Sequence, residues 1–211
     1  MATTKTSIVK HHATKNYTAY DITCFNHKIR TIVTCCPTVV TSWINHIRNQ
    51  KPNHPFSLAG LDTEWLHPIA ILQLCVGPNC LIYQLIHTPW VPSVLEDFLG
   101  DPHYTFTGLG ISGDSKMLSK DYKLELSCLM DVGKVATKEG KVRVNAGLKE
   151  VAKAVLGWEM EKNKAITLSK WNKEVLDDEQ VLYACLDAFV SYHLGRELIS
   201  PHSIECDQGL C

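Results

Sequence analysis

The chain has 211 residues, of which 45% are hydrophobic and 20% are charged, and its formal net charge is −1. This composition is typical of a globular protein, and the length suits one domain with a sizeable core. The sequence has no uninterrupted run of about 18 apolar residues and no apolar N-terminal segment, so we expect neither a membrane span nor a secretion signal. We therefore expect an intracellular protein, in the cytoplasm, the nucleus or both.

Hydrophobic periodicity and turn residues predict the secondary structure in chain order. The predicted elements are strands at 20–24 and 28–34 that form a hairpin, a helix at 38–49, strands at 56–64, 69–76 and 80–85, a helix at 91–99, a strand at 104–108, a helix at 111–119, a strand at 125–130, and helices at 146–155 and 177–198. Strands come first and then alternate with helices, which indicates one α/β domain with a mixed sheet. We place this domain at 20–199, with an N-terminal extension at 1–19 and a C-terminal tail at 200–211.

The nine cysteines are an odd number, and most of them lie within apolar runs, as Cys75, Cys128 and Cys185 do. The sequence has no CxxC pair, no HExxH pattern and no cluster of cysteine and histidine at the spacing of zinc ligands. We therefore expect buried free thiols in a reducing compartment, rather than a disulfide framework or a structural zinc site.

Two acidic residues, Asp62 and Glu64, end the apolar strand predicted at 56–64. Residues i and i+2 of a strand point to the same face, so both carboxylates converge at the end of this strand. Hard divalent cations such as Mg²⁺ and Mn²⁺ prefer oxygen ligands of this kind. The alternative is a strand that simply ends at two exposed acids, and the pair alone does not exclude it.

A third acid lies on the last predicted helix, where Tyr183 and Asp187 are four residues apart and share one face. Asp187 follows an apolar face, which indicates that its carboxylate points inward at a cation. A tyrosine one turn away is well placed to orient a water there. The alternative is a tyrosine at the edge of the core and an ordinary surface aspartate.

Gly108, Gly110 and Gly113 form a G-x-G-x-x-G pattern between a predicted strand and a predicted helix, and Asp131 ends the next predicted strand. This pattern imitates the dinucleotide-binding fingerprint and supplies a second hypothesis, a dinucleotide-dependent enzyme. Against it, Asp114 would place a negative charge beside the pyrophosphate at the helix N-terminus. The other acidic segments would also have no role, so we favour Asp114 as a further carboxylate of the metal site.

Taken together, the segments follow the order D-x-E, then D after a glycine turn, then Y-x-x-x-D on a late helix. This order resembles the DEDD superfamily of 3′–5′ exonucleases with RNase H-like folds, in its tyrosine form, because the histidine form has a histidine where this chain has Leu182. The flanking sequences LDTEW with AILQLCVG, GLGISGDSKML and WNKEVLDDEQVLYACLDAFVSYHLG are similar to the Werner-syndrome-like exonuclease family over about residues 56–195. The run CVGPNCLIYQL resembles short plant members, including the RISC-interacting clearing exoribonucleases.

The resemblance implies an RNase H-like (DnaQ-like) fold with a mixed sheet of five to six strands flanked by helices. It implies a divalent-metal-dependent 3′–5′ exonuclease that acts on single-stranded RNA or DNA, with RNA favoured, and releases nucleoside 5′-monophosphates. Asp62, Glu64 and Asp187 would hold one Mg²⁺ or Mn²⁺ ion, and Asp62 with Asp114 would hold a second. Tyr183 would orient the attacking water.

Candidate substrate contacts lie beside these motifs, at Thr63, Trp65, Leu109 and Ile111. Trp65 is expected either to stack on a base or to pack beside the strand end. Leu109 and Ile111 are expected either to contact the terminal bases or to pack in the core. The chain departs from the family in the three-residue segment after Trp65, which is shorter than usual in a loop that often borders the substrate in the family.

For partners, the resemblance implies a ring-shaped homo-oligomer, a hexamer, and an RNA-silencing protein as a possible partner.

The alternative to an active nuclease is a catalytically inactive nucleic-acid-binding or scaffold protein of the same fold. An inactive member would be free to lose one of the motif residues, and this chain keeps all of them, which argues against this alternative. The motif residues are Asp62, Glu64, Asp114, Tyr183 and Asp187.

Overall fold

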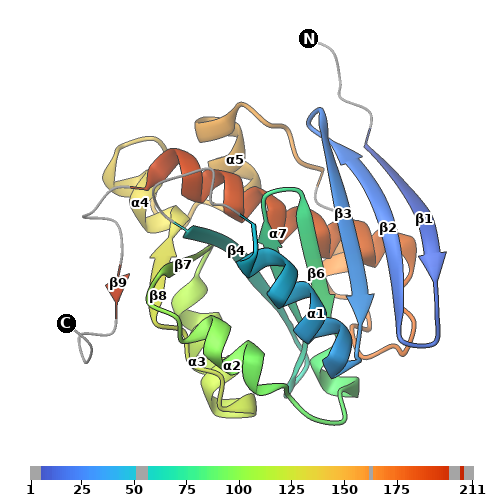
Figure 1. The fold of residues 1–211 in the computed structure, drawn as a ribbon. Coiled ribbons are helices and arrows are strands. Elements are labelled where there is room, and N and C mark those ends of the chain that lie inside the picture. Colours follow the sequence, from blue (N-terminus) through green and yellow to red (C-terminus); the bar gives the residue numbers. More distant parts are fainter. Residues whose placement is uncertain (1–5, 51–56, 162–163, 200–204, 207–211) are drawn as a thin grey trace.

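The computed structural model describes residues 6–50, 57–161, 164–199 and 205–206. Within these residues nine strands form one sheet in the order β1-β2-β3-β6-β5-β4-β7-β8-β9 (Figure 1). The strands are β1 (Ser7–Ala13), β2 (Tyr17–Cys24), β3 (His27–Thr34), β4 (Ser57–Trp65), β5 (Ile69–Val76), β6 (Asn79–Tyr83), β7 (Tyr104–Gly108), β8 (Cys128–Asp131) and β9 (Glu205–Cys206). The pairs β3/β6, β4/β7 and β7/β8 are parallel and the others antiparallel, so the sheet is mixed, as predicted.

Helices cover both faces of this sheet (Figure 1). They are α1 (Pro37–Arg48), α2 (Ser93–Leu99), α3 (Ile111–Tyr122), α4 (Val132–Lys138), α5 (Leu148–Leu156), α6 (Lys164–Thr167) and α7 (Asp178–Leu198), with a 3₁₀ turn η1 (Leu85–His87). One face packs against α1, α2 and α3, and the other packs against α7 with α4 and α5. None of the helices in the described ranges combines the length and apolarity needed to cross a lipid bilayer.

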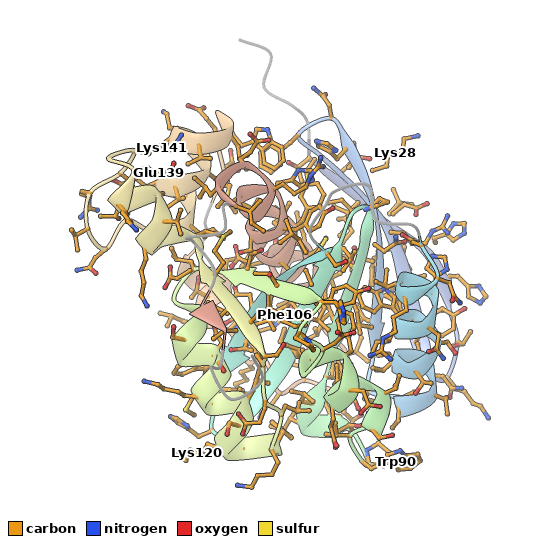
Figure 2. The ribbon with its side chains drawn as sticks, turned by 60° about the vertical axis from the view of Figure 1, so that its left-hand side comes forward. Lys28, Trp90, Phe106, Lys120, Glu139 and Lys141 are labelled. Atoms are coloured by element: carbon orange, nitrogen blue, oxygen red, sulfur yellow. The ribbon has the colours of Figure 1, made fainter. Side chains whose placement is uncertain are left out.

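The central strands are apolar because they are covered on both faces. On β5, Leu72 and Leu74 pack with the helices of the first face, whereas Ile71 and Cys75 pack beneath α7. Phe106 on β7 has no exposed surface and lies in the interior, whereas Trp90 is 60% exposed and points away from the fold (Figure 2). A near-continuous hydrophobic run therefore marks a strand buried between two helical layers.

The long helix α7 crosses the sheet at a fixed position. It begins with a capping box, in which the Asp177 carboxylate accepts from the Gln180 N–H and the Gln180 side chain accepts from the Asp177 N–H. A methyl group added at Gly60 of β4 would lie 2.0 Å from the Ala188 carbonyl oxygen, so only glycine allows this approach. The Thr107 hydroxyl of β7 also donates to the Ser191 carbonyl, at 2.8 Å. These contacts hold α7 directly against β4 and β7.

The structure differs from the predicted elements in the sheet and in the short helices. β1 was not predicted, and it pairs with β2 although it lies within residues 1–19. All its residues except the half-buried Ile8 are exposed, so its sequence lacks the alternation that identifies a strand. The short helices α4 and α6 were also missed, and the nine strands of the described residues exceed the five to six expected. Of the predicted tail, β9 pairs with β8, and residues 200–204 and 207–211 lie outside the described residues.

The cysteines largely follow the prediction. Free thiols in the described residues are Cys24, Cys35, Cys36, Cys75, Cys80 and Cys185. Burial raises the pKa of the Cys75, Cys80 and Cys185 thiols, which keeps them protonated. Cys128 is disulfide-bonded, so the expectation of a free thiol is wrong at this position. In the β8–β9 ladder Cys128 lies opposite Cys206, a pairing of distant segments that the sequence could not show.

Candidate active site

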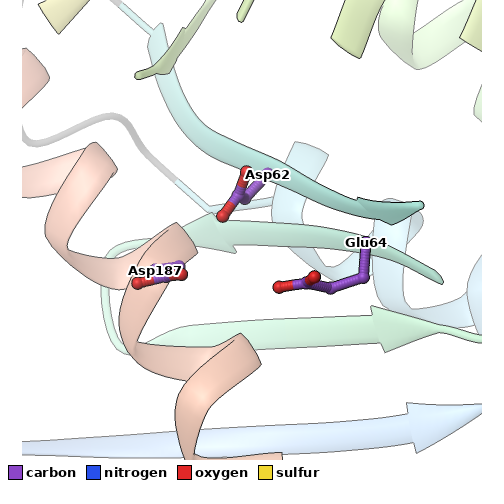
Figure 3. Close-up of side chains that lie close together, drawn as sticks. All are labelled: Asp62, Glu64 and Asp187. Atoms are coloured by element: carbon purple, nitrogen blue, oxygen red, sulfur yellow. The ribbon is translucent and has the colours of Figure 1, made fainter. Parts of the chain in front are cut away.

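Three carboxylates meet where the end of β4 passes beneath α7. Asp62 and Glu64 point to the same face of β4, and Asp187 comes down from the helix, so the three side chains converge (Figure 3). One carboxylate oxygen from each lies within 4.8 Å of the other two. Glu64 is 9% exposed and Asp187 only 2%. Negative charges so close together and so poorly hydrated repel one another, and a divalent cation would neutralise them.

Asp114 lies near these three acids, but its carboxylate points to Thr63 and Trp65 instead of to them. It belongs to the first turn of α3, and its Oδ1 atom accepts hydrogen bonds from the Thr63 hydroxyl at 2.6 Å and from the Trp65 indole N–H at 3.2 Å. Thr63 and Trp65 alternate along β4 with Asp62 and Glu64, so Asp114 meets the strand from the opposite side. Burial raises the pKa of Asp114 to about 6, although both hydrogen bonds act to lower it.

Tyr183 lies one helical turn before Asp187 and borders the same pocket. Its ring is mostly buried and packs against Trp171, with the ring centroids 5.9 Å apart. Its hydroxyl accepts a hydrogen bond of 3.1 Å from the Thr167 hydroxyl, and the Trp171 indole donates to the Thr167 carbonyl. The Tyr183 side chain is therefore held in a defined orientation beside the carboxylates.

The pocket over the three acids has a volume of about 230 Å³. Its lining contains the predicted residues Thr63, Leu109 and Tyr183, together with residues that were not predicted: Leu148, Thr167 and Ser191. No local pattern in the sequence distinguishes these three, because they come from α5, from the four-residue α6 and from α7. They become neighbours only through tertiary packing.

The other predicted substrate contacts have different surroundings. Trp65 is 44% exposed, so its ring remains accessible at the end of β4. Ile111 has no exposed surface and packs in the core beneath α3. Of the two expectations for Ile111, the structure therefore supports core packing and leaves it no face to offer to a base.

The glycine turn before Asp114 has structural roles in this fold. Gly110 adopts a left-handed conformation with φ of 72° at the start of α3. A methyl group at Gly108 would lie 2.6 Å from the Leu61 carbonyl oxygen of β4. The glycines thus allow the chain to turn sharply against β4 and bring Asp114 to Thr63, which explains the pattern without a dinucleotide.

Comparison with known proteins places this geometry in a family. Residues 32–200 match the family model DNA_pol_A_exo1, described as 3′-5′ exonuclease. The chain is 28% identical over 150 residues to the bifunctional 3′-5′ exonuclease/ATP-dependent helicase WRN of Mus musculus, covering 67% of this chain and 11% of that protein. It is also 28% identical over 165 residues to a 3′-5′ exonuclease of Arabidopsis thaliana, covering 74% of this chain and 57% of that protein.

A solved structure shares the fold. Escherichia coli RNase D, an exoribonuclease involved in structured RNA processing, matches with a TM-score of 0.67 and 20% identity, over 79% of this chain and 43% of that one. The RNase H-like fold class is thereby confirmed. The chain spans less than two thirds of the length of each curated relative cited above. Since the family model covers most of its length, the chain belongs to the family of 3′-5′ exonuclease domains.

Proposed function

We propose that this chain is a divalent-metal-dependent 3′–5′ exonuclease of the DEDD tyrosine type. It hydrolyses phosphodiester bonds from the 3′ end of single-stranded nucleic acid and releases nucleoside 5′-monophosphates. The observation that carries the proposal is the convergence of Asp62, Glu64 and Asp187 within 4.8 Å in a pocket of a 3′-5′ exonuclease fold. The preference for RNA over DNA rests on the resemblance to the clearing exoribonucleases.

The donor set fits Mg²⁺ or Mn²⁺, because all three groups are carboxylates and hard cations prefer oxygen. Asp62, Glu64 and Asp187 would hold one ion, and Asp62 with Asp114 would hold the second of two. When bound, the ions stabilise the negative charge on the attacking and leaving oxygens. Asp114, whose Oδ1 accepts from Thr63 and Trp65, would support the second ion through a water molecule.

The remaining residues orient the reactants. The Tyr183 hydroxyl, fixed by Thr167, holds the attacking water in line with the terminal phosphodiester. The exposed indole of Trp65 stacks on a base near the 3′ end, and Leu109 provides an apolar contact in the pocket. Thr63, on the strand between two metal ligands, contacts the terminal nucleotide.

The proposal is tested with oligonucleotides labelled at the 5′ end, one single-stranded RNA and one DNA of the same sequence, incubated with Mg²⁺ or Mn²⁺. We expect stepwise shortening that stops in EDTA and in Asp62→Ala, with nucleoside 5′-monophosphates as products and RNA shortened faster. The control is Asp97→Ala, which removes an exposed acid on α2 and should leave the rate unchanged. Binding of the oligonucleotides without shortening would instead support the inactive nucleic-acid-binding protein.

Assembly and location are further parts of the proposal that rest on resemblance alone. We propose a ring-shaped homo-hexamer that works with an RNA-silencing protein, in the cytoplasm, the nucleus or both. Light scattering coupled to size-exclusion chromatography gives the mass of the assembly, and a monomeric mass would reject the ring. A fluorescent fusion locates the protein in the cell.

A further inference from the structure

A glutamine lies fully buried in the middle of the apolar strand β5. Gln73 has no exposed surface, and neither its side-chain nitrogen nor its side-chain oxygen has a hydrogen-bond partner in the structure. Burying an unpaired polar group costs about 1–3 kcal/mol. A leucine or methionine would fill the same space without this cost, so the amide calls for a functional explanation.

The strand register places Gln73 beside the carboxylate site. Gln73 is directly opposite Asp62 in the antiparallel β4–β5 pair, and opposite Ile82 in the β5–β6 pair. Side chains directly opposite in neighbouring strands point to the same face, with Cβ atoms about 4.5–5.5 Å apart. Within this row across the sheet, Ile82 offers no polar atom. Asp62 is therefore the polar one of the two residues opposite Gln73 in the neighbouring strands.

The local packing prevents the amide from turning toward solvent. Ile71 and Cys75, the neighbours of Gln73 on this face of β5, pack with Ala184 and Ala188 of α7 in one apolar cluster. This cluster covers the α7 side of β5 and leaves the glutamine no route to solvent. Of the two side chains directly opposite Gln73 in the neighbouring strands, Asp62 is the one that can accept a hydrogen bond from its amide.

We propose that Gln73 is a positioning residue for Asp62, whose carboxylate accepts a hydrogen bond from the Gln73 amide when a divalent cation is bound. The Thr63 N–H already donates to Asp62 Oδ1 at 3.0 Å and fixes one side of the carboxylate. The Gln73 amide fixes the carboxylate from the neighbouring strand and keeps it turned toward Glu64 and Asp187. Carboxylates that ligate metals are commonly held by such partners, whose loss weakens metal affinity about 10- to 100-fold. This inference rests on the proposed metal site.

The proposal predicts opposite effects on metal binding and on the metal-free fold. Gln73→Met keeps the length and volume of the side chain but removes the amide. We expect its melting temperature in EDTA to equal or exceed that of the wild type, because an unpaired buried polar group is lost. We expect its dissociation constant for Mn²⁺, measured by isothermal titration calorimetry, to rise about 10- to 100-fold.

The matched control makes the same substitution at a glutamine whose side-chain amide is hydrogen-bonded. The Gln84 side chain is nearly buried and donates to the Lys173 and Glu174 carbonyls, at 2.9 and 3.2 Å, next to a different pocket. Gln84→Met should lower the melting temperature in EDTA and leave the Mn²⁺ dissociation constant within threefold of the wild type. Gln73→Leu repeats the test if the methionine variant does not fold.

The Mn²⁺ dissociation constant decides the outcome. An increase of tenfold or more in the Gln73 variant, absent from the Gln84 variant, supports the proposal. An unchanged constant overturns it, whatever happens to the melting temperature, and makes Gln73 a structural residue. If the wild type itself binds no Mn²⁺, or binds it and degrades no oligonucleotide, the proposed function fails. Failure of the proposed function is distinguishable from failure of the Gln73 proposal, because it is seen with the wild type before any variant is compared.

Discussion

At the scale of single residues, the site combines groups that the sequence marks with groups that it does not. Asp62, Glu64 and Asp187 are acids that follow apolar runs, and such placement is informative because burying an unused carboxylate is costly. Thr167 carries no such mark, since a threonine in a short polar segment is ordinary. Its importance comes from one hydrogen bond to Tyr183.

Thr167→Val tests this hydrogen bond, because valine keeps the shape of threonine and removes the hydroxyl. A net hydrogen bond contributes about 0.5–1.5 kcal/mol, so we expect kcat to fall about 2- to 10-fold with the Mn²⁺ affinity unchanged. Steady-state kinetics on a single-stranded RNA measures the change. In a Tyr183→Phe background the same substitution should have no further effect. Additive losses in that double-mutant cycle would show that Thr167 acts independently of Tyr183.

His193 of α7 makes the stability of the fold depend on pH. Burial lowers the pKa of His193 to about 4 from an ordinary value of 6.5, and His27 and Arg196 nearby act in the same direction. Between these two pH values the unfolded chain binds a proton that the folded chain does not. Stability therefore falls as the pH decreases from about 6.5 to about 4, by about 2 kcal/mol after allowing for solvent screening.

Urea unfolding of wild type and His193→Phe across this pH range checks the prediction. The difference in unfolding free energy between them should change by about 2 kcal/mol from pH 7 to pH 4. The difference between wild type and variant is needed because Asp114, whose pKa is raised to about 6, makes a contribution of the opposite sign to the stability of both proteins. This contribution cancels in the difference. His12→Phe, at an exposed histidine of β1, is the control for the substitution itself. A constant difference for His193→Phe would mean that this histidine is hydrated in solution.

At the scale of elements, the site depends on how closely α7 approaches β4. The helix brings Asp187 to the strand end, and Gly60 permits the contact because a side chain there would meet the helix backbone. The same helix carries Tyr183, so one packing contact positions two of the predicted catalytic residues. Further along α7, Phe189 packs in an aromatic group with Trp158 and His193 that ties the helix to the β2–β3 turn.

Gly60→Ala should disturb both the fold and the site. A methyl group 2.0 Å from the Ala188 carbonyl oxygen forces α7 away from β4, which we expect to cost about 3 kcal/mol in unfolding free energy. Mn²⁺ affinity should also fall, because Asp187 moves with the helix. Gly147→Ala is the matched control, since nothing lies within 4 Å of the added methyl group. Its effect should stay within about 1 kcal/mol, the usual range at a helix start.

At the scale of the whole molecule, three carboxylates held together by tertiary packing destabilise the metal-free fold. A cation that binds the folded chain and not the unfolded chain stabilises it by mass action. At a Mn²⁺ concentration about 100 times the dissociation constant this amounts to about 2.7 kcal/mol, or about 5–10 °C in melting temperature. Differential scanning fluorimetry in EDTA, Mg²⁺ and Mn²⁺ measures it. An unchanged melting temperature at millimolar concentrations of both ions would argue against the metal site, and Asp187→Asn should remove most of the shift.

Much of the fold could be predicted from the sequence, because local patterns determine its central elements. The strand at Ile69–Val76 has the predicted bounds, and α7 begins one residue later than predicted, since continuous apolar runs and capping residues are local signals. The strand β1 could not be predicted in this way. Apart from the half-buried Ile8 its residues are exposed, and its pairing with β2 is what makes it a strand.

The sequence by itself determined the motif residues, the α/β class and the order in which the acidic segments follow one another. Those properties depend on residue type and spacing, which the chain carries without folding. Only the tertiary structure decided which side of β4 each acid meets: Asp187 joins Asp62 and Glu64, whereas Asp114 turns to Thr63. It also brought Thr167 to Tyr183 and set Gln73 opposite Asp62. Contacts between distant segments follow from strand register and helix packing, and no local pattern records them.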